Sequence, residues 1–249
     1  VAELERAVGA TDNGLSAYWK QGLRADSESG DFKFKIGGRI MVDFLNFVNP
    51  DEDLEAHLGE DLESGTEFRR ARLYVSGQIY ENVEFKSQFD FAGGDADFKD
   101  VYMKLKFPCW GYFQVGHFHS PFGLEEQTSS KYITFMERSL PAGLAPSRKT
   151  GMKVGGNFEK DNWNWGAGVF RESNGYGDDT GNTGQGEWNL AARIAGRPWI
   201  SHDGDSFLHT GVSGMLLNPA DEEARIRSRG AQHIGPRFVD TSTFMTDDG

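Results

Sequence analysis

Apolar and polar side chains alternate over long stretches of this chain, most regularly in residues 66–91. Successive side chains of a β-strand point to opposite faces, so a period of two predicts strands with one apolar and one polar face. A tight turn at residues 81–82 divides this stretch into a predicted hairpin. The same alternation predicts further strands at residues 32–44, 98–107, 110–118, 150–160, 163–169, 187–199 and 206–217.

The connections between these strands sort by length. The short ones are residues 81–82, 108–109, 160–162 and 200–205, and the longer ones are the acidic loop 49–65, 92–97, 119–149, 173–186 and 219 onward. Alternate connections of an up-and-down meander lie at the same end of the sheet. The sorting therefore predicts tight turns at one end and long loops at the other, which is typical of an outer-membrane β-barrel. Greek-key crossings in a β-sandwich do not produce it.

Composition narrows the class of protein. There is no apolar run long enough for a transmembrane helix, and a net charge of −12 argues against nucleic acid as a partner. We expect residues 1–30 to form an N-terminal periplasmic segment or strap, with weak β character at 15–25, and residues 31–249 to form an all-β, up-and-down antiparallel transmembrane β-barrel domain.

The placement of charge favours a barrel over a soluble sheet. The polar faces of the predicted strands carry eleven Lys and Arg residues against four acids, while most other acids fall in loops. Cations that faced lipid would each cost about 2–4 kcal/mol at the bilayer midplane, so in a membrane they must line the lumen. A cation-lined passage concentrates anions. Alternation alone still allows a soluble β-sheet protein that binds a ligand on its aromatic face.

Four segments carry a family resemblance. FKFKIGGRIMVDF at 32–44, FRRARLYVSGQIYENVEFKSQFDFA at 68–92, KDVYMKLKF at 99–107 and VGHFHSPFGLEEQTSSKYITFMERSL at 115–140 resemble the phosphate-selective porin O and P family. The resemblance implies a sixteen-stranded, homotrimeric barrel in outer-membrane lipid of a Gram-negative bacterium, which passes phosphate, polyphosphate or related inorganic anions. Nine or ten strands do not complete such a barrel, so we expect the C-terminal strands to be missing from this sequence.

The same resemblance implies which residues contact the anion. Positions on the wall and on an inward constriction loop at 119–149 match Arg39, Arg70, Asp100, Ser129, Ser130 and Lys131. Arg69 belongs to the same Arg-Arg pair, but strict alternation points it outward. A lysine cluster on the periplasmic side would comprise Lys33, Lys35, Lys104 and Lys106. Arg225 and Arg227 resemble an arginine ladder, although both could equally be solvated loop charges.

Some residues depart from this pattern. Glu125 and Glu126 place negative charge in the proposed constriction loop, which leaves a general, weakly selective porin as an alternative. His117 and His119 lie two residues apart on a strand end, but no third ligand is evident, so we predict neither metal nor cofactor. No catalytic motif is recognisable, and we do not expect an enzyme.

Overall fold

The computed structural model of the protein describes residues 14–49, 52–58, 61–171, 188–218, 223–229 and 232–246. The loop predicted at 173–186 and the first thirteen residues of the predicted N-terminal segment lie outside the described residues. Within these ranges no helix is long and apolar enough to cross a bilayer.

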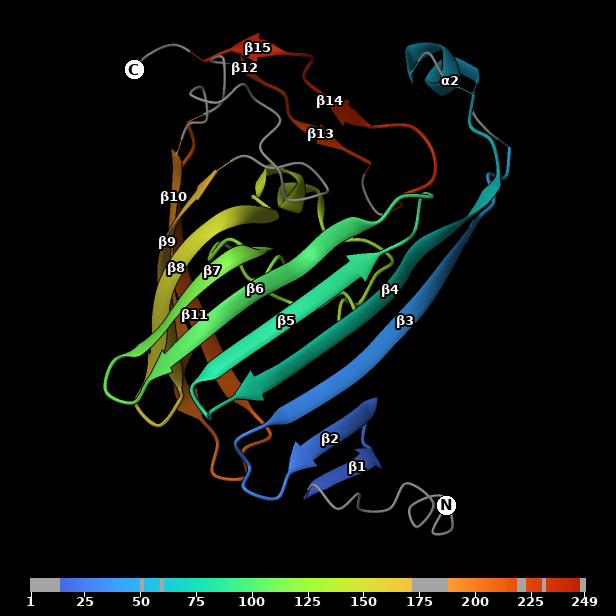
Figure 1. Ribbon diagram of the computed structural model, residues 1–249. Helices are drawn as coiled ribbons and strands as arrows, with labels where there is room; N and C mark the ends of the chain where they lie inside the picture. The colour runs from blue at the N-terminus through green and yellow to red at the C-terminus, as the bar shows by residue number, and fades with distance from the viewer. Residues whose placement is uncertain are drawn as a thin grey trace.

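Eleven strands of the described residues form one antiparallel sheet, in which each strand pairs with the next along the chain (Figure 1). They are β1 (Leu15–Trp19), β2 (Leu23–Ser27), β3 (Lys33–Leu45), β4 (Gly65–Ile79), β5 (Val83–Asp90), β6 (Asp97–Phe107), β7 (Gly111–His119), β8 (Arg148–Phe158), β9 (Trp163–Arg171), β10 (Trp188–Ile200) and β11 (Phe207–Leu216). The sheet curves until β11 passes behind β5 and β6, as the wall of an incomplete β-barrel does (Figure 1). The predicted all-β, up-and-down topology is confirmed.

The two ends of the sheet differ as the loop lengths predict. Tight turns after β4, β6, β8 and β10 lie at one end, which we call the short-turn end. The connections after β3 and β7 and the segment after β11 lie at the other, the long-loop end (Figure 1). That last segment contains two small two-stranded sheets, formed by β12 (Glu223–Ala224) with β15 (Phe244–Met245) and by β13 (Arg227–Ser228) with β14 (Val239–Asp240).

Two segments are more regular than the sequence indicates. The connection after β3, predicted as an acidic loop, contains helix α2 (Glu52–Leu58), whose first turn is acidic. Carboxylates favour the positive end of the helix dipole, which explains why an acidic stretch can form a helix here. The weakly β-like N-terminal stretch forms the hairpin β1–β2, which extends the sheet beyond β3. The strands β1 and β2 have five residues each. They are therefore shorter than the roughly 9–11 residues with which a β-strand crosses a bilayer.

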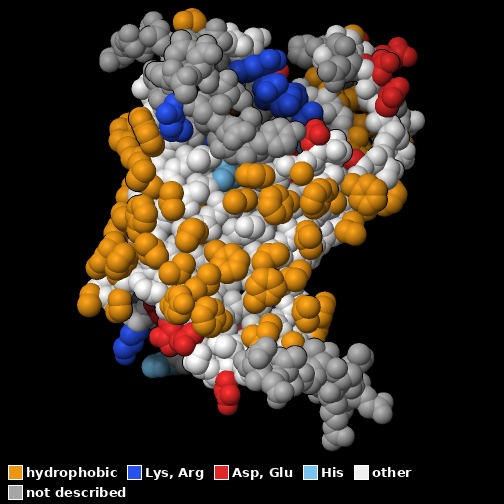
Figure 2. Space-filling view, in the orientation of Figure 1, with side chains coloured by type: hydrophobic (Ala, Val, Ile, Leu, Met, Phe, Trp, Pro, Cys, Tyr) orange, Lys and Arg blue, Asp and Glu red, His pale blue; other side chains and the backbone are white. Residues whose placement is uncertain are grey.

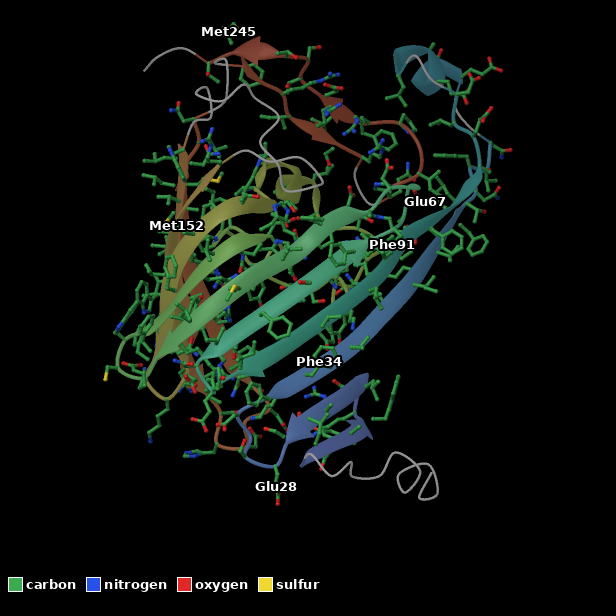
Figure 3. All side chains as sticks on the ribbon, viewed as in Figure 1. Glu28, Phe34, Glu67, Phe91, Met152 and Met245 are labelled. Atoms are coloured by element: carbon green, nitrogen blue, oxygen red, sulfur yellow. The ribbon has the colours of Figure 1, made fainter. Side chains whose placement is uncertain are left out.

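The sheet has an apolar convex face and a polar concave face. A band of apolar side chains covers the face in Figure 2, between charged groups at both ends. Figure 3 labels three of its members, Phe34, Phe91 and Met152, each at least 40% exposed. Arg70, by contrast, is 2% exposed. A soluble protein buries apolar residues and exposes charged ones, so this inverted distribution fits a sheet whose outer face meets an apolar medium.

Candidate anion-binding site

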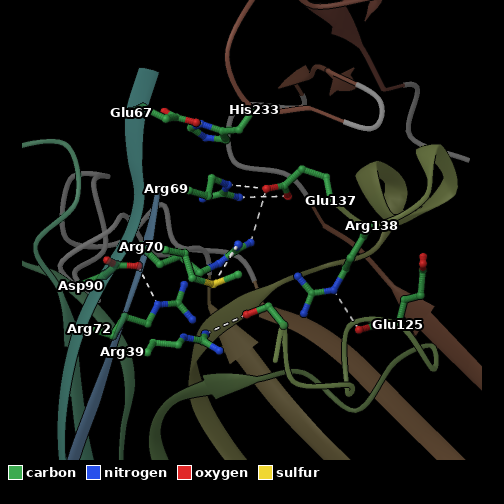
Figure 4. A network of polar contacts seen from close by, with 12 residues as sticks. Arg39, Glu67, Arg69, Arg70, Arg72, Asp90, Glu125, Glu137, Arg138 and His233 are labelled. Carbon is green, nitrogen blue, oxygen red and sulfur yellow. Dashed lines mark hydrogen bonds and ion pairs between the residues drawn. The ribbon is translucent and has the colours of Figure 1, made fainter. Parts of the chain in front are cut away.

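A β-bulge turns both members of the Arg-Arg pair toward the concave face. In the β3–β4 pairing, Met41 lies opposite Arg70 but the next residue, Val42, lies opposite Phe68, so Arg69 is an extra residue on β4. An extra residue breaks the strict alternation of faces. The prediction that Arg69 points outward is therefore wrong: its side chain binds Glu137, which also contacts Arg70 (Figure 4).

A second irregularity lies between β5 and β6. Ser87 pairs with Val101 and Phe89 pairs with Phe98, so two β6 residues, Lys99 and Asp100, face a single residue on β5. Asp100 accepts hydrogen bonds from Lys86 Nζ at 2.5 Å and from Arg148 Nε at 2.7 Å. This carboxylate on β6 therefore links β5 and β8, the second of which lies two strands away across β7, on the concave face.

The connection between β7 and β8 folds back inside the curve of the sheet (Figure 1). It contains no strand, and its one regular element is the short 3-10 helix η1 (Leu140–Leu144). Ser130 accepts a hydrogen bond from Arg39 Nη2 at 2.7 Å, and Glu137 binds Arg69. Polar contacts with β3 and β4 thus hold the connection against the concave face.

Two adjacent residues of the connection, Glu137 and Arg138, are each held by charge-assisted hydrogen bonds. Arg138 donates to the backbone carbonyls of Glu125 and Thr128 at 2.8 and 2.9 Å. Burial alone would raise the pKa of the Glu137 carboxyl, but the hydrogen bond from Arg69 and the positive charges of Arg69 and Arg70 outweigh it. The pKa of Glu137 therefore lies below its ordinary value, and Glu137 is ionised at neutral pH.

Between the connection and strands β3–β6 lies a cavity of about 560 Å³, which we call the central cavity. The residues expected at the binding zone all line it, namely Arg39, Arg69, Arg70, Asp100, Ser129, Ser130 and Lys131. The lining also holds seven other charged or potentially charged groups: Lys35, Arg72, Lys86, Lys99, His119, Arg138 and Arg148. The described lining thus contains ten Lys and Arg residues and a single carboxylate, that of Asp100.

Several guanidinium donors at the central cavity lack an acceptor. Nε and Nη1 of Arg39 and Nε of Arg70 are buried and find no hydrogen-bond partner among the described residues. A buried donor without a partner costs about 1–3 kcal/mol, and more when it is charged. An anion with several acceptor oxygens would satisfy these groups, because guanidinium binds oxoanions through paired hydrogen bonds.

The four expected cluster lysines lie toward the short-turn end. Lys104 and Lys106 approach Glu84 at 3.3 and 3.1 Å. Lys33 and Lys35 line a neighbouring cavity of about 290 Å³, to which Glu84 also contributes. The structure thus brings the four lysines near one another and places a carboxylate among them, which reduces their net charge.

The two arginines expected to form a ladder differ in environment. Arg225 binds Asp240 through Nε and Nη2 at 2.7 and 2.6 Å and does not line the central cavity. Arg227 lines a separate cavity of about 260 Å³ at the long-loop end, together with Arg229 and Arg237. Of this pair, only Arg227 faces a cavity that Arg69 also lines.

Glu125 and Glu126, the two acids expected to weaken anion affinity, do not line the central cavity. Glu125 accepts hydrogen bonds from the backbone and hydroxyl of Ser139. Glu126 lies 3.5 Å from Arg138 and 3.3 Å from His119. The described residues contain no group of three or more potential metal ligands.

Several cations of the central cavity were not expected there from the sequence. Arg72 and Lys86 are two of the eleven cations counted on the polar strand faces, but neither was expected at the site. Lys99 enters through the second bulge, which no local pattern marks. Arg138 and Arg148 come from or adjoin the irregular connection, where no periodicity indicates which side chains face inward.

Comparison with known proteins gives a consistent result. A family model described as "Phosphate-selective porin O and P" matches residues 34–236. Porin O of Pseudomonas aeruginosa is 26% identical over 234 residues, which cover 90% of this chain and 50% of that protein. The chain thus spans about half the length of this curated relative. Because the family model covers most of the sequence, the chain belongs to the phosphate-selective porin O and P family.

Proposed function

We propose that the protein forms an anion-selective channel of the outer membrane of a Gram-negative bacterium and passes phosphate or polyphosphate by passive diffusion. The observation that carries the proposal is the central cavity, whose described lining has ten cationic side chains, two of which, Arg39 and Arg70, have guanidinium donors with no partner among the described residues. In this proposal the convex face contacts lipid, the concave face lines the lumen, and three copies associate. No catalytic step is involved.

The β7–β8 connection acts as the constriction in this proposal. It carries Ser129, Ser130 and Lys131 to the central cavity, opposite the strand arginines. A permeating oxoanion exchanges its hydration water for hydrogen bonds from these side chains. It is then released because side chains of the site also have hydrogen-bond partners within the protein. Ser130 already binds Arg39, and Glu137 already binds Arg69, so the anion competes with the channel's own acceptors.

Anion selectivity and the position of the anion-binding site are tested by separate measurements in planar bilayers. The reversal potential in a KCl gradient is expected to show chloride preference, and added phosphate is expected to reduce the chloride current. Cation preference would refute the proposal. Arg39→Gln should weaken the phosphate block by about tenfold, the effect of losing one charge-assisted hydrogen bond.

The matched control is Arg193→Gln. Arg193 lies on β10, hydrogen-bonds Asn164 at 2.9 Å and does not line the central cavity. Equal loss of block in the two variants would show that the anion responds to general positive charge, not to a site at Arg39.

A general, weakly selective porin remains the second candidate, because the connection also carries acids. Glu126 and Glu137 pair with Arg138, Arg69 and Arg70, and each pair removes positive charge that a permeating anion would feel. That candidate predicts a reversal potential near zero and no phosphate block.

A further inference from the structure

Arg72 lies in the central cavity opposite a residue of the same charge. It is the register partner of Arg39 across β3 and β4, and both line the cavity. Figure 4 shows the two guanidinium groups next to each other, and the charge of Arg72 acts on Arg39. Like charges directly opposite on antiparallel strands destabilise a sheet, so the arrangement needs a compensating negative charge.

Among the described residues, only Arg72 of this pair forms an ion pair with an acid. Arg72 Nε donates to Asp90 Oδ2 at 2.6 Å, whereas the acceptor for Arg39 is the neutral hydroxyl of Ser130. Nε and Nη1 of Arg39 have no acceptor among the described residues. Between the two side chains there remains an excess of charge and of hydrogen-bond donors.

Asp90 fixes the direction of Arg72. Its Oδ1 accepts hydrogen bonds from the backbone amides of Ala71 at 2.9 Å and Ala92 at 3.4 Å, and its side chain is 5% exposed. A carboxylate anchored by the backbone does not follow the arginine, so the arginine must adopt the geometry that Asp90 sets. The bond to Asp90 uses Nε, and no described residue accepts a hydrogen bond from Nη1 or Nη2 of Arg72, so both are left for another acceptor.

We infer that Arg72 and Arg39 form a two-guanidinium clamp for one doubly charged tetrahedral oxoanion, with Asp90 as the residue that positions Arg72. The inference rests on the proposed function and deepens it. Two forks converging on one site favour an anion with several oxygens and two charges over a spherical monoanion such as chloride. Sulfate is a suitable probe because it keeps two charges across the working pH range.

The first test compares Arg72→Gln and Arg72→Lys in the reconstituted protein. Both variants are expected to weaken the block of chloride current by sulfate and phosphate by about tenfold, since lysine keeps the charge but not the fork. Block that is unchanged in Arg72→Gln, or fully retained in Arg72→Lys, overturns the clamp.

The second test asks whether Asp90→Asn strengthens or weakens the block of chloride current by oxoanions. This variant removes a negative charge beside the central cavity, so a purely electrostatic account predicts tighter oxoanion block. Positioning predicts the opposite, a block weakened by about threefold or more, because Arg72 loses its fixed acceptor. Tighter block would overturn the positioning role, and heat-modifiable gel mobility verifies that the variant is folded.

Controls separate this inference from the proposed function. If the unmodified protein shows neither anion preference nor oxoanion block, the proposed function itself fails. If Arg39→Gln weakens the block while Arg72→Gln matches the control Arg193→Gln, only the clamp fails.

Discussion

The contact between Glu137 and Arg69 is expected to hold the β7–β8 connection in place. Both carboxylate oxygens of Glu137 accept hydrogen bonds from Arg69, and Arg70 Nη2 lies 3.5 Å away. The side chains of Arg69 and Glu137 are 18% and 13% exposed, so solvent screens the pair only in part. Exposed pairs contribute about 0.2–1 kcal/mol, and losing one partner of a fully buried pair costs about 3–5 kcal/mol.

The expected coupling energy lies between these limits. For a charge-assisted pair of this burial we expect about 1.5–3 kcal/mol. Each 1.4 kcal/mol changes an equilibrium tenfold. Glu137→Gln should therefore increase the fraction of molecules with an open connection by about tenfold or more.

Limited proteolysis of the folded protein measures this opening, because cleavage follows the population of the open state when reclosing is fast. A double-mutant cycle of Arg69→Gln and Glu137→Gln isolates the coupling between the two side chains. Glu81→Gln, in the tight turn after β4, is the control for loss of one carboxylate. A coupling below about 1 kcal/mol, the upper end of the range of exposed pairs, would refute the argument that this contact holds the connection.

Three further outcomes follow from the structure. The pKa of Glu137 lies below its ordinary value, so its stabilising contribution is complete above the unfolded-state pKa of about 4.3 and is lost as pH falls further. The protease resistance of the connection should therefore be constant from neutral pH to about pH 5 and decline below about pH 4. The decline should be less steep in Glu137→Gln, which lacks the titrating carboxyl. Gly116→Ala should lower the free energy of unfolding in guanidinium by about 1–3 kcal/mol, because Gly116 has a φ of +133° and an added Cβ would lie 2.2 Å from the Val101 carbonyl oxygen. Gly214→Ala is the control: there is open space around its Cβ, so the free energy of unfolding should change little. Arg225→Gln breaks an exposed ion pair outside the central cavity, so the concentration of phosphate that halves the chloride current should change by less than about twofold.

Periodicity explains why the strands were predictable. A strand with one face in an apolar medium and the other in water must alternate, so β3 to β11 can be recognised from local sequence within a few residues of their ends. Loop lengths then predicted the topology, because an up-and-down sheet returns every second connection to the same end. Neither argument depends on which residues meet across the molecule.

The same reasoning fails where alternation stops. Strict alternation placed Arg69 on the wrong face because a bulge adds a residue without any compositional signal. In the β7–β8 connection several side chains are directed by partners far along the chain, such as Arg69 for Glu137, 68 residues away. The two glutamates expected to weaken the site, Glu125 and Glu126, are held by Ser139 and Arg138 instead.

The net charge of the chain is negative, whereas the charge of the side chains that line the central cavity is positive. The arrangement of the acids explains this difference. The total is −12, yet the described lining of the central cavity has ten cations and one carboxylate. Salt screens exposed charges beyond about 8 Å at physiological ionic strength, while enclosed charges are screened much less. Acids on exposed connections therefore add little to the potential inside. Under the proposed function, what an anion would meet there depends on the lining arginines and on how far Asp90, Asp100 and Glu137 neutralise them, so we expect these few carboxylates, and not the total charge, to control selectivity.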